Sequence, residues 1–175
     1  MSIEYISGQV TQIKQKYDQG DPYRLCRDLN ILLLTEAMGS RPRDCKGFFL
    51  YQARQPVITV NSDLAEELQR IILAHEIGHA VLHRKASKIR AFHDFALFDE
   101  TSRYEYEANI FAADYLMDDN VVLDLLNEDI SFFGAASLLE VPAELLDFKF
   151  RVLKRKGYKV IDPPLQAQAN FLKKV

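Results

Sequence analysis

Residues 58–79 read ITVNSDLAEELQRIILAHEIGH, and this stretch decides the fold. Its first residues are mostly β-branched, which is typical of a strand. After the polar residues 61–63, apolar side chains recur every three or four positions and no proline intervenes, a pattern that predicts a long helix. Asp63 and Glu66 have the spacing of a helix-capping box, so we expect this helix to begin near residue 63.

The predicted helix carries two histidines, His75 and His79, four residues apart. Because an α-helix turns once every 3.6 residues, both imidazoles lie on one face and can reach the same tetrahedral ion. Glu76 can take a proton from a water molecule at the metal instead of binding the metal itself. The motif therefore predicts two zinc ligands and a general base. An HExxH motif alone also arises by chance around buried structural histidines.

A catalytic zinc ion usually has a third protein ligand. In one class of zinc peptidases it is a histidine six residues after the second one, but here that position is Lys85. A better candidate lies on a second predicted helix, residues 104–117, where Glu105 and Asn109 share one face. Glu105 is therefore the predicted third ligand. Asn109 is predicted to hydrogen-bond a ligand imidazole from outside the metal site.

Two further residues compete for roles at this site. Glu107 is an alternative to Glu105 as the ligand, although it points to another face of its helix. His83 lies four residues after His79 and is predicted to pack beside the ligands or hydrogen-bond one of them, rather than bind the metal.

The rest of the chain predicts more helices and a small sheet. Helical periodicity extends over residues 4–17, 22–38, 131–140 and 142–156, and Gly157 is a typical helix stop. Residues 47–51 and 56–60 are rich in aromatic and β-branched side chains, which predicts two antiparallel strands, and residues 158–161 can form a short third strand.

Composition indicates an ordinary globular protein. The 175 residues are 48% hydrophobic and 27% charged, with a formal net charge of -3, which gives no sign of bulk nucleic-acid affinity. The segment 149–156 is basic, and a helix-turn-helix before it could suggest a DNA-binding face. We interpret these basic residues instead as a solvated helix end. No apolar run is long enough to cross a bilayer, so we expect a cytoplasmic protein without membrane or direct nucleic-acid contacts.

Two motifs together carry a resemblance to a known family. HEIGHAVLH at residues 75–83, followed by EYEANIFAADYLM at residues 105–117, resembles the ImmA/IrrE metallopeptidases, which are short zincin-like proteins of bacteria and phages. The strand-to-helix stretch at residues 58–79 is also similar to that family, as is VPAELLDFKFRVLKRKGY at residues 141–158.

The resemblance implies zinc on His75, His79 and Glu105, with catalysis by Glu76. It also implies a substrate that is often a helix-turn-helix repressor, cleaved to release a mobile element or a stress programme. One departure is Asp118, which stands where proline is common in the family.

These observations predict an α+β, zincin-like single domain over residues 1–162, in which a small antiparallel sheet flanks the HEIGH helix, and a C-terminal tail over residues 163–175. The predicted function is a zinc-dependent endopeptidase that cleaves a helix-turn-helix repressor, with the strand at residues 56–60 expected to pair with the extended substrate. A regulatory protein that binds a repressor without cleaving it, and a hydrolase or toxin with another substrate, are the alternatives.

Overall fold

The computed structural model describes residues 1–17, 20–84, 92–94, 102–128 and 130–161, so the predicted tail lies outside the described residues. The elements are α1 (Ile3–Tyr17), α2 (Pro22–Asp28), β1 (Leu32–Glu36), β2 (Gly47–Gln52), β3 (Gln55–Asn61), α3 (Glu66–Leu82), β4 (Phe92–Asp94), α4 (Arg103–Leu116), α5 (Asp119–Asn127), α6 (Phe132–Leu138) and α7 (Ala143–Arg155). The predicted α+β class is confirmed. Within the described residues, no helix has the length and apolarity needed to span a membrane.

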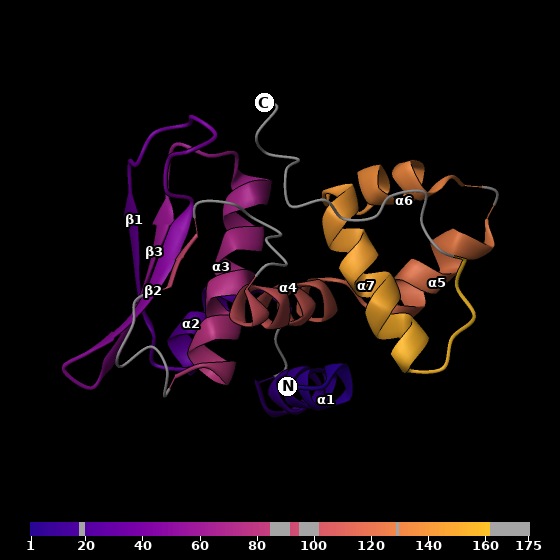
Figure 1. The fold of residues 1–175 in the computed structure, drawn as a ribbon, viewed down its shortest axis with the longest axis horizontal. Helices are drawn as coiled ribbons and strands as arrows, with labels where there is room; N and C mark the ends of the chain where they lie inside the picture. The colour runs from indigo at the N-terminus through magenta and orange to yellow at the C-terminus, as the bar shows by residue number, and fades with distance from the viewer. Residues whose placement is uncertain (18–19, 85–91, 95–101, 129, 162–175) are drawn as a thin grey trace.

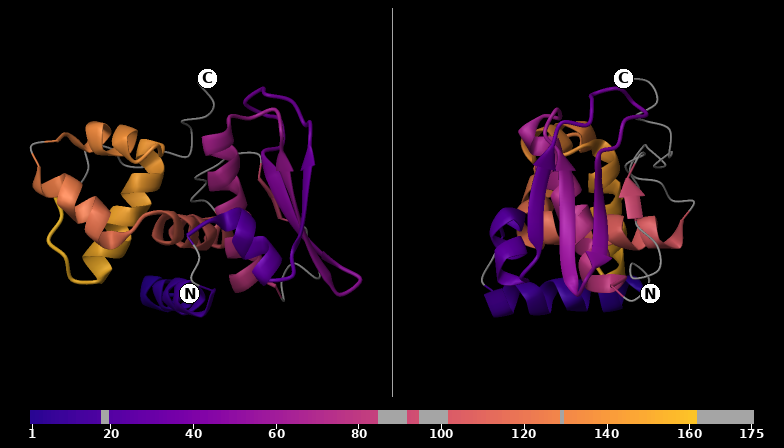
Figure 2. Two further views of the ribbon diagram at one scale, coloured as in Figure 1. Left: turned by 180° about the vertical axis from the view of Figure 1, so that it is seen from behind. Right: turned by 90° about the vertical axis from the view of Figure 1, so that its left-hand side faces the viewer.

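The sheet stands at one end of the molecule, with α3 along its inner face (Figure 1). The two further views show the same layering, with the sheet on one side of α3, α4 to α7 on the other, and α2 beside α3 (Figure 2). α4 crosses α3, α1 packs beneath α4, and α5–α7 gather at the far end. The HEIGH helix is therefore enclosed between the sheet and α4.

The sheet has the strand order β1-β3-β2-β4. The predicted antiparallel pair is confirmed as β2 and β3, in which Phe49 lies opposite Ile58. β4 adds a second antiparallel pair, whereas β1 lies parallel to β3 and makes the sheet mixed. The expectation that residues 56–60 offer an exposed edge to a substrate is wrong, because β3 lies between β1 and β2 and both of its edges are occupied.

The prediction of a helix over residues 22–38 is wrong in its second half. α2 ends at Asp28, Asn30 adopts a left-handed conformation with φ 54°, and the chain continues as β1. The run of leucines before Thr35 has no period that separates a helix from a strand, so the sequence alone favoured the longer helix. Pairing of β1 with β3 decides the conformation.

The start of α3 also differs from the prediction. The helix begins at Glu66, and its N-cap residue Ala65 forms no capping hydrogen bond. The Asp63 carboxylate accepts a hydrogen bond from the Gly39 amide at 2.7 Å instead, and thus fastens the β1–β2 loop. The predicted capping box is therefore wrong, because a tertiary contact uses the carboxylate that would have capped the helix.

The helices predicted near the C-terminus are confirmed as α6 and α7. Gly157 ends this region with φ 94°, but residues 158–161 form no strand, so that prediction is wrong. The chain there leaves the helix through a hydrogen bond from the Tyr158 amide to the Leu153 carbonyl, and this places it beside α7 rather than beside the sheet.

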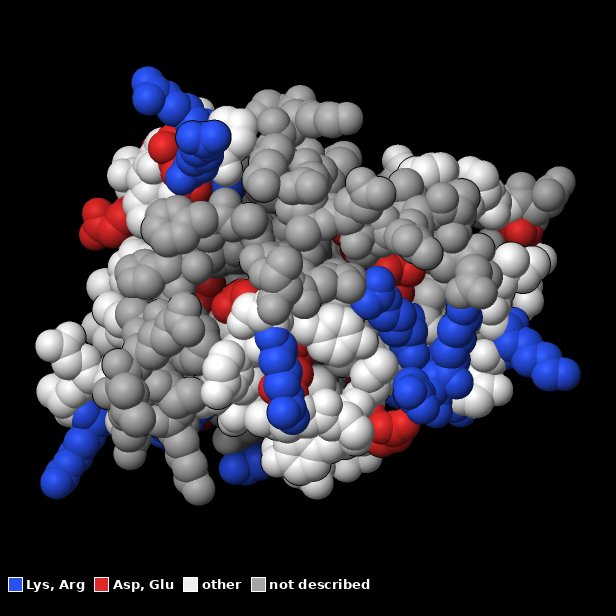
Figure 3. Space-filling view, in the orientation of Figure 1, with Lys and Arg blue, Asp and Glu red and all other residues white. Residues whose placement is uncertain are grey.

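The basic segment 149–156 is only partly a solvated helix end. Lys149 is fully buried and donates to Asp114 at 2.7 Å and to Asp119 at 2.5 Å, and Lys156 pairs with the same two carboxylates. Lys154 and Arg155 are exposed. In the space-filling view, blue and red side chains lie next to one another over this part of the molecule (Figure 3). The cluster ties α4, α5 and α7 together.

Candidate metal centre

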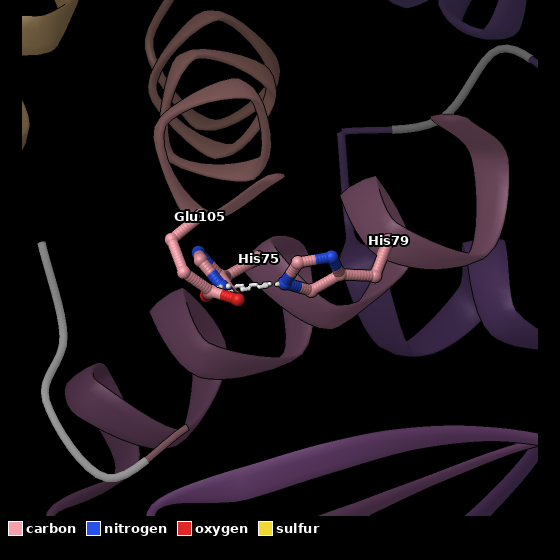
Figure 4. A group of neighbouring side chains, drawn as sticks. All are labelled: His75, His79 and Glu105. Carbon is pink, nitrogen blue, oxygen red and sulfur yellow. Dashed lines mark hydrogen bonds and ion pairs between the residues drawn. The ribbon is translucent and has the colours of Figure 1, made fainter. Parts of the chain in front are cut away.

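Three side chains from two helices converge at one point (Figure 4). The Nε2 atoms of His75 and His79 on α3 lie 3.0 Å apart, and one carboxylate oxygen of Glu105 on α4 lies 3.1 Å and 3.3 Å from them. Both histidines are 1% exposed, and the side chain of Glu105 is 18% exposed. Among the described residues, these three form a group whose ligand atoms can hold a metal ion.

The geometry of this cluster fits a divalent cation such as zinc. Two imidazole nitrogens and one carboxylate oxygen are a frequent ligand set of catalytic zinc sites, which leave a fourth position open. Ligand atoms about 2.0–2.1 Å from a tetrahedral ion lie about 3.3 Å from one another. The observed separations of 3.0–3.3 Å approach that value, so a tetrahedral ion fits among them with little movement.

The orientation of His75 is set from α4. Its Nδ1 lies 2.9 Å from Oδ1 of Asn109, a fully buried residue. A carbonyl oxygen only accepts hydrogen bonds, so Nδ1 of His75 donates to Asn109 and its Nε2 faces the cluster. Asn109 thus makes the contact expected from its position one helical turn after Glu105.

Close packing between the two helices brings Glu105 to the histidines. Gly78 on α3 faces α4, and a Cβ built on this glycine would lie 3.2 Å from Ala108 Cα and 3.2 Å from Phe111 Cβ. Any larger residue at position 78 would move α4, and the carboxylate of Glu105 with it. The sequence analysis gave no role to Gly78, since a glycine inside a helix has no periodicity signal of its own.

Glu76 points from α3 toward the sheet and is fully buried. A Cβ built on Gly47 of β2 would lie 3.6 Å from Oε1 of Glu76 and 2.6 Å from Ile72 Cγ2. The missing side chain at position 47 therefore leaves room for both residues. Sequence reasoning treated Gly47 only as the start of a strand and missed this contribution.

Burial governs the protonation of the cluster. It lowers the pKa of His79 to about 4, with Glu105 opposing this effect and His75 adding to it. Burial alone would raise the pKa of Glu105, but its polar contacts with His75 and His79 outweigh burial and lower that pKa. The preferred state is neutral imidazole beside ionised carboxylate, which is the state that binds a metal.

His83 and Glu107 lie outside the cluster and contact each other. His83 Nδ1 is 3.0 Å from Nδ1 of His79, and His83 Nε2 is 2.9 Å from Oε2 of Glu107. Tyr104 packs edge-on against the His83 ring, with the centroids 5.0 Å apart. Glu107 therefore does not replace Glu105 in the cluster, and His83 takes the position beside a ligand that its spacing indicated.

A family model described as the IrrE N-terminal-like domain, peptidase M78, matches residues 26–151. The chain belongs to this family. One relative, "Uncharacterized immunity region protein 2" of Bacillus phage phi105, is 31% identical over 144 residues, which cover 82% of this chain and 88% of the relative.

Membership in the peptidase M78 family confirms the resemblance found in the sequence, and it indicates a metallopeptidase. The matched region contains α3 and α4, and thus every residue of the candidate metal centre.

Proposed function

We propose that this protein is a zinc-dependent endopeptidase, with zinc bound by His75, His79 and Glu105. The observation that carries the proposal is the convergence of one possible ligand atom from each residue within 4.8 Å of one another. The three residues lie on α3 and α4, within the region that matches the peptidase family. Zinc is favoured over magnesium or calcium because two of the three ligands are imidazoles, whereas the harder cations prefer oxygen. The fold unit proposed to carry the activity comprises residues 1–162.

In the proposed reaction, Glu76 is the general base. A bound zinc ion supplies Lewis acidity that polarises the scissile carbonyl and lowers the pKa of water. Glu76 takes a proton from the attacking water and passes it to the nitrogen of the leaving amine, so the peptide bond breaks and a carboxylate and an amine form. Full burial of Glu76 keeps its carboxylate away from bulk solvent and available for this transfer.

The proposed substrate is a helix-turn-helix transcriptional repressor in the cytoplasm. Support comes from the phage relative, whose name places it in an immunity region, the part of a phage genome that holds repressor functions. Cleavage of such a repressor would release a mobile element or a stress response. Direct binding of nucleic acid is not part of the proposal, because Lys149, the first residue of the basic segment, is buried in ion pairs.

The test compares the wild type with His79→Ala. Metal content is measured by atomic emission on both purified proteins, and each is incubated with the repressor encoded beside the gene. We expect near-stoichiometric zinc and cleavage for the wild type, and loss of both for the variant. Zinc without cleavage of any candidate repressor would reject the proposed substrate, and a wild type that binds no zinc would reject the metal centre.

A further inference from the structure

A groove lies on the helix pair that carries the candidate metal centre, but away from the cluster itself. It has a volume of about 460 Å³ and is lined by α2, the first turns of α3, the end of α4 and the turn between α6 and α7. None of the three candidate ligands lines it. Leu116, which does, follows Glu105 by about three turns of α4, or roughly 16 Å along the helix axis. The groove is therefore a second recess, separate from the cluster.

The charges that line the groove are mostly negative. Glu66 and Glu67 belong to the first turn of α3 and Glu140 to the turn before α7, and Arg70 supplies one positive charge. All four side chains are exposed. Within the part of the chain that the structure describes, none of the three carboxylates forms an ion pair or a side-chain hydrogen bond. This excess of unpaired carboxylates favours a cationic partner.

Apolar side chains form the inner part of the groove. Ile71 is 3% exposed, Leu116 is half-buried, and Tyr23 adds an aromatic ring. A lysine or arginine side chain has the matching construction, an apolar stem that ends in a charged head. The stem can pack on Ile71 and Leu116 while the head reaches the exposed carboxylates, and an aromatic ring also attracts a cation. The volume suits a small guest, such as one such side chain with part of its backbone.

A buried polar group beside the groove has no partner among the described residues. Tyr115, which precedes Leu116, is 1% exposed and its hydroxyl forms no hydrogen bond there. Burial raises the pKa of Tyr115, Asp21 raises it further and Arg70 lowers it, so the hydroxyl lies near α2 and Arg70, which also line the groove. An unpaired buried hydroxyl costs free energy, and a bound segment that brings a polar group to it would recover that cost.

We propose that the groove is a docking site for a lysine or arginine side chain of the protein substrate. The proposal rests on the proposed function in taking a DNA-binding repressor as that substrate. Because such a protein neutralises DNA phosphates with lysine and arginine, it carries exposed basic side chains when it is free of DNA. The groove holds the substrate by one of them, at a distance from the bond to be cleaved. Nucleic acid itself does not fit, because its phosphates would meet the carboxylates.

Docking away from the cluster contributes binding that is the same before and during the reaction. Its loss should therefore raise KM and leave kcat unchanged. The test variant combines Glu67→Gln with Glu140→Gln, which removes two charges at exposed positions. Exposed ion pairs are individually weak, so we expect KM for the repressor encoded beside the gene to rise about 3–10-fold. The matched control combines Asp124→Asn with Glu128→Gln, two exposed acids of the α5 region outside the groove, and should keep the wild-type KM.

A second measurement needs neither a metal nor cleavage. ¹⁵N-labelled full-length protein is titrated with acetyl-Ala-Arg-Ala-amide, and separately with the same peptide carrying citrulline, which has the shape of arginine without its charge. We expect the arginine peptide to shift the amide signals of Gln69, Arg70 and Leu116, and the citrulline peptide to leave them in place. The groove variant should bind the arginine peptide about 3–10-fold more weakly, and the α5 control should bind it as the wild type does.

The two peptides decide the proposal even if the groove variant fails to fold. Absent shifts with the arginine peptide, or equal shifts with the citrulline peptide, would overturn it. An equal loss of affinity in the groove variant and the α5 control would also overturn it, since the effect would then be one of net charge. Cleavage of the repressor with an unchanged KM in the groove variant would reject the docking role. Peptide binding as expected without any cleavage of the repressor would count against the proposed function alone.

Discussion

Gly78 of α3 lies so close to Ala108 of α4 that a Cβ on the glycine would be 3.2 Å from the Ala108 Cα atom. This relationship sets the distance between the histidines and Glu105, since the two helices carry the three candidate ligands. The width of the candidate metal centre is thus set by a residue that is not itself one of the three candidate ligands.

Gly78→Ala should therefore weaken metal binding. The added methyl group needs a few tenths of an ångström from the α4 backbone, so we expect Glu105 to move away and zinc affinity to fall about 10-fold, an effect on the scale of a disturbed outer contact. The measurement is chelator competition. Gly8→Ala in α1 is the control, because a Cβ there meets nothing within 4 Å. It should keep zinc affinity and stabilise the protein by up to about 1 kcal/mol. Equal zinc affinity in both variants would contradict the prediction.

Glu76→Gln should separate catalysis from binding. The amide cannot accept the proton of the attacking water, so we expect repressor cleavage to fall by at least about 10²-fold while bound zinc stays at the wild-type level. Cleavage is followed by gel and zinc by atomic emission on the same samples. If Glu76→Gln still inactivates the repressor as well as the wild type does, the protein acts by binding, as in the non-cleaving alternative.

The metal-free protein should lose stability in mild acid. Burial lowers the pKa of His79 to about 4 and that of His83 to about 3, whereas an imidazole in the unfolded chain titrates near pH 6.5. Below pH 6.5 the unfolded chain therefore binds protons that the folded protein does not. The free energy of unfolding should fall by up to about 1.4 kcal/mol per pH unit for each imidazole until the folded pKa is reached.

Urea denaturation of EDTA-treated protein at several pH values measures this dependence. Stability should be level above about pH 7.5, where both states are neutral. His79→Gln removes one of the titrating groups and should show a shallower decline. A wild-type profile that stays flat from neutral pH down to about pH 5 would rule out neutral, buried imidazoles at these positions.

Lys149→Met should destabilise the protein without affecting the metal centre. It leaves the buried Asp114 with Lys156 as its remaining ion-pair partner, and removal of one member of a buried pair costs about 3–5 kcal/mol. Thermal unfolding followed by circular dichroism reports the loss, with the exposed Lys159→Met as the control, which should change stability by about 0.5 kcal/mol or less. A similar melting temperature for the two variants would show that the ion pairs of Lys149 with Asp114 and Asp119 do not stabilise the fold.

The sequence predicted the centre of the site better than its surroundings. Spacing within one helix is a local property, so the shared face of His75 and His79 and the stripe of Glu105 and Asn109 could be read directly from the chain. The contact between His83 and Glu107 joins residues 24 positions apart, one directly after α3 and the other on α4. No local pattern encodes such a contact, and Glu107 was weighed only as a rival ligand.

The fold errors have the same origin. β1 was assigned to a helix because its run of leucines is compatible with either a helix or a strand. Only its parallel pairing with β3 decides between the two. Asp63 was assigned to a helix cap because the capping box is local, whereas its observed partner is the amide of Gly39 on another loop. β3 is a central strand because β1 pairs with one of its edges. No local sequence pattern predicts that pairing.

All the described groups that form and orient the metal cluster belong to α3, to His83 directly after it, or to α4. A graft of α3, His83 and α4 into another scaffold would therefore carry these described groups with it as one unit.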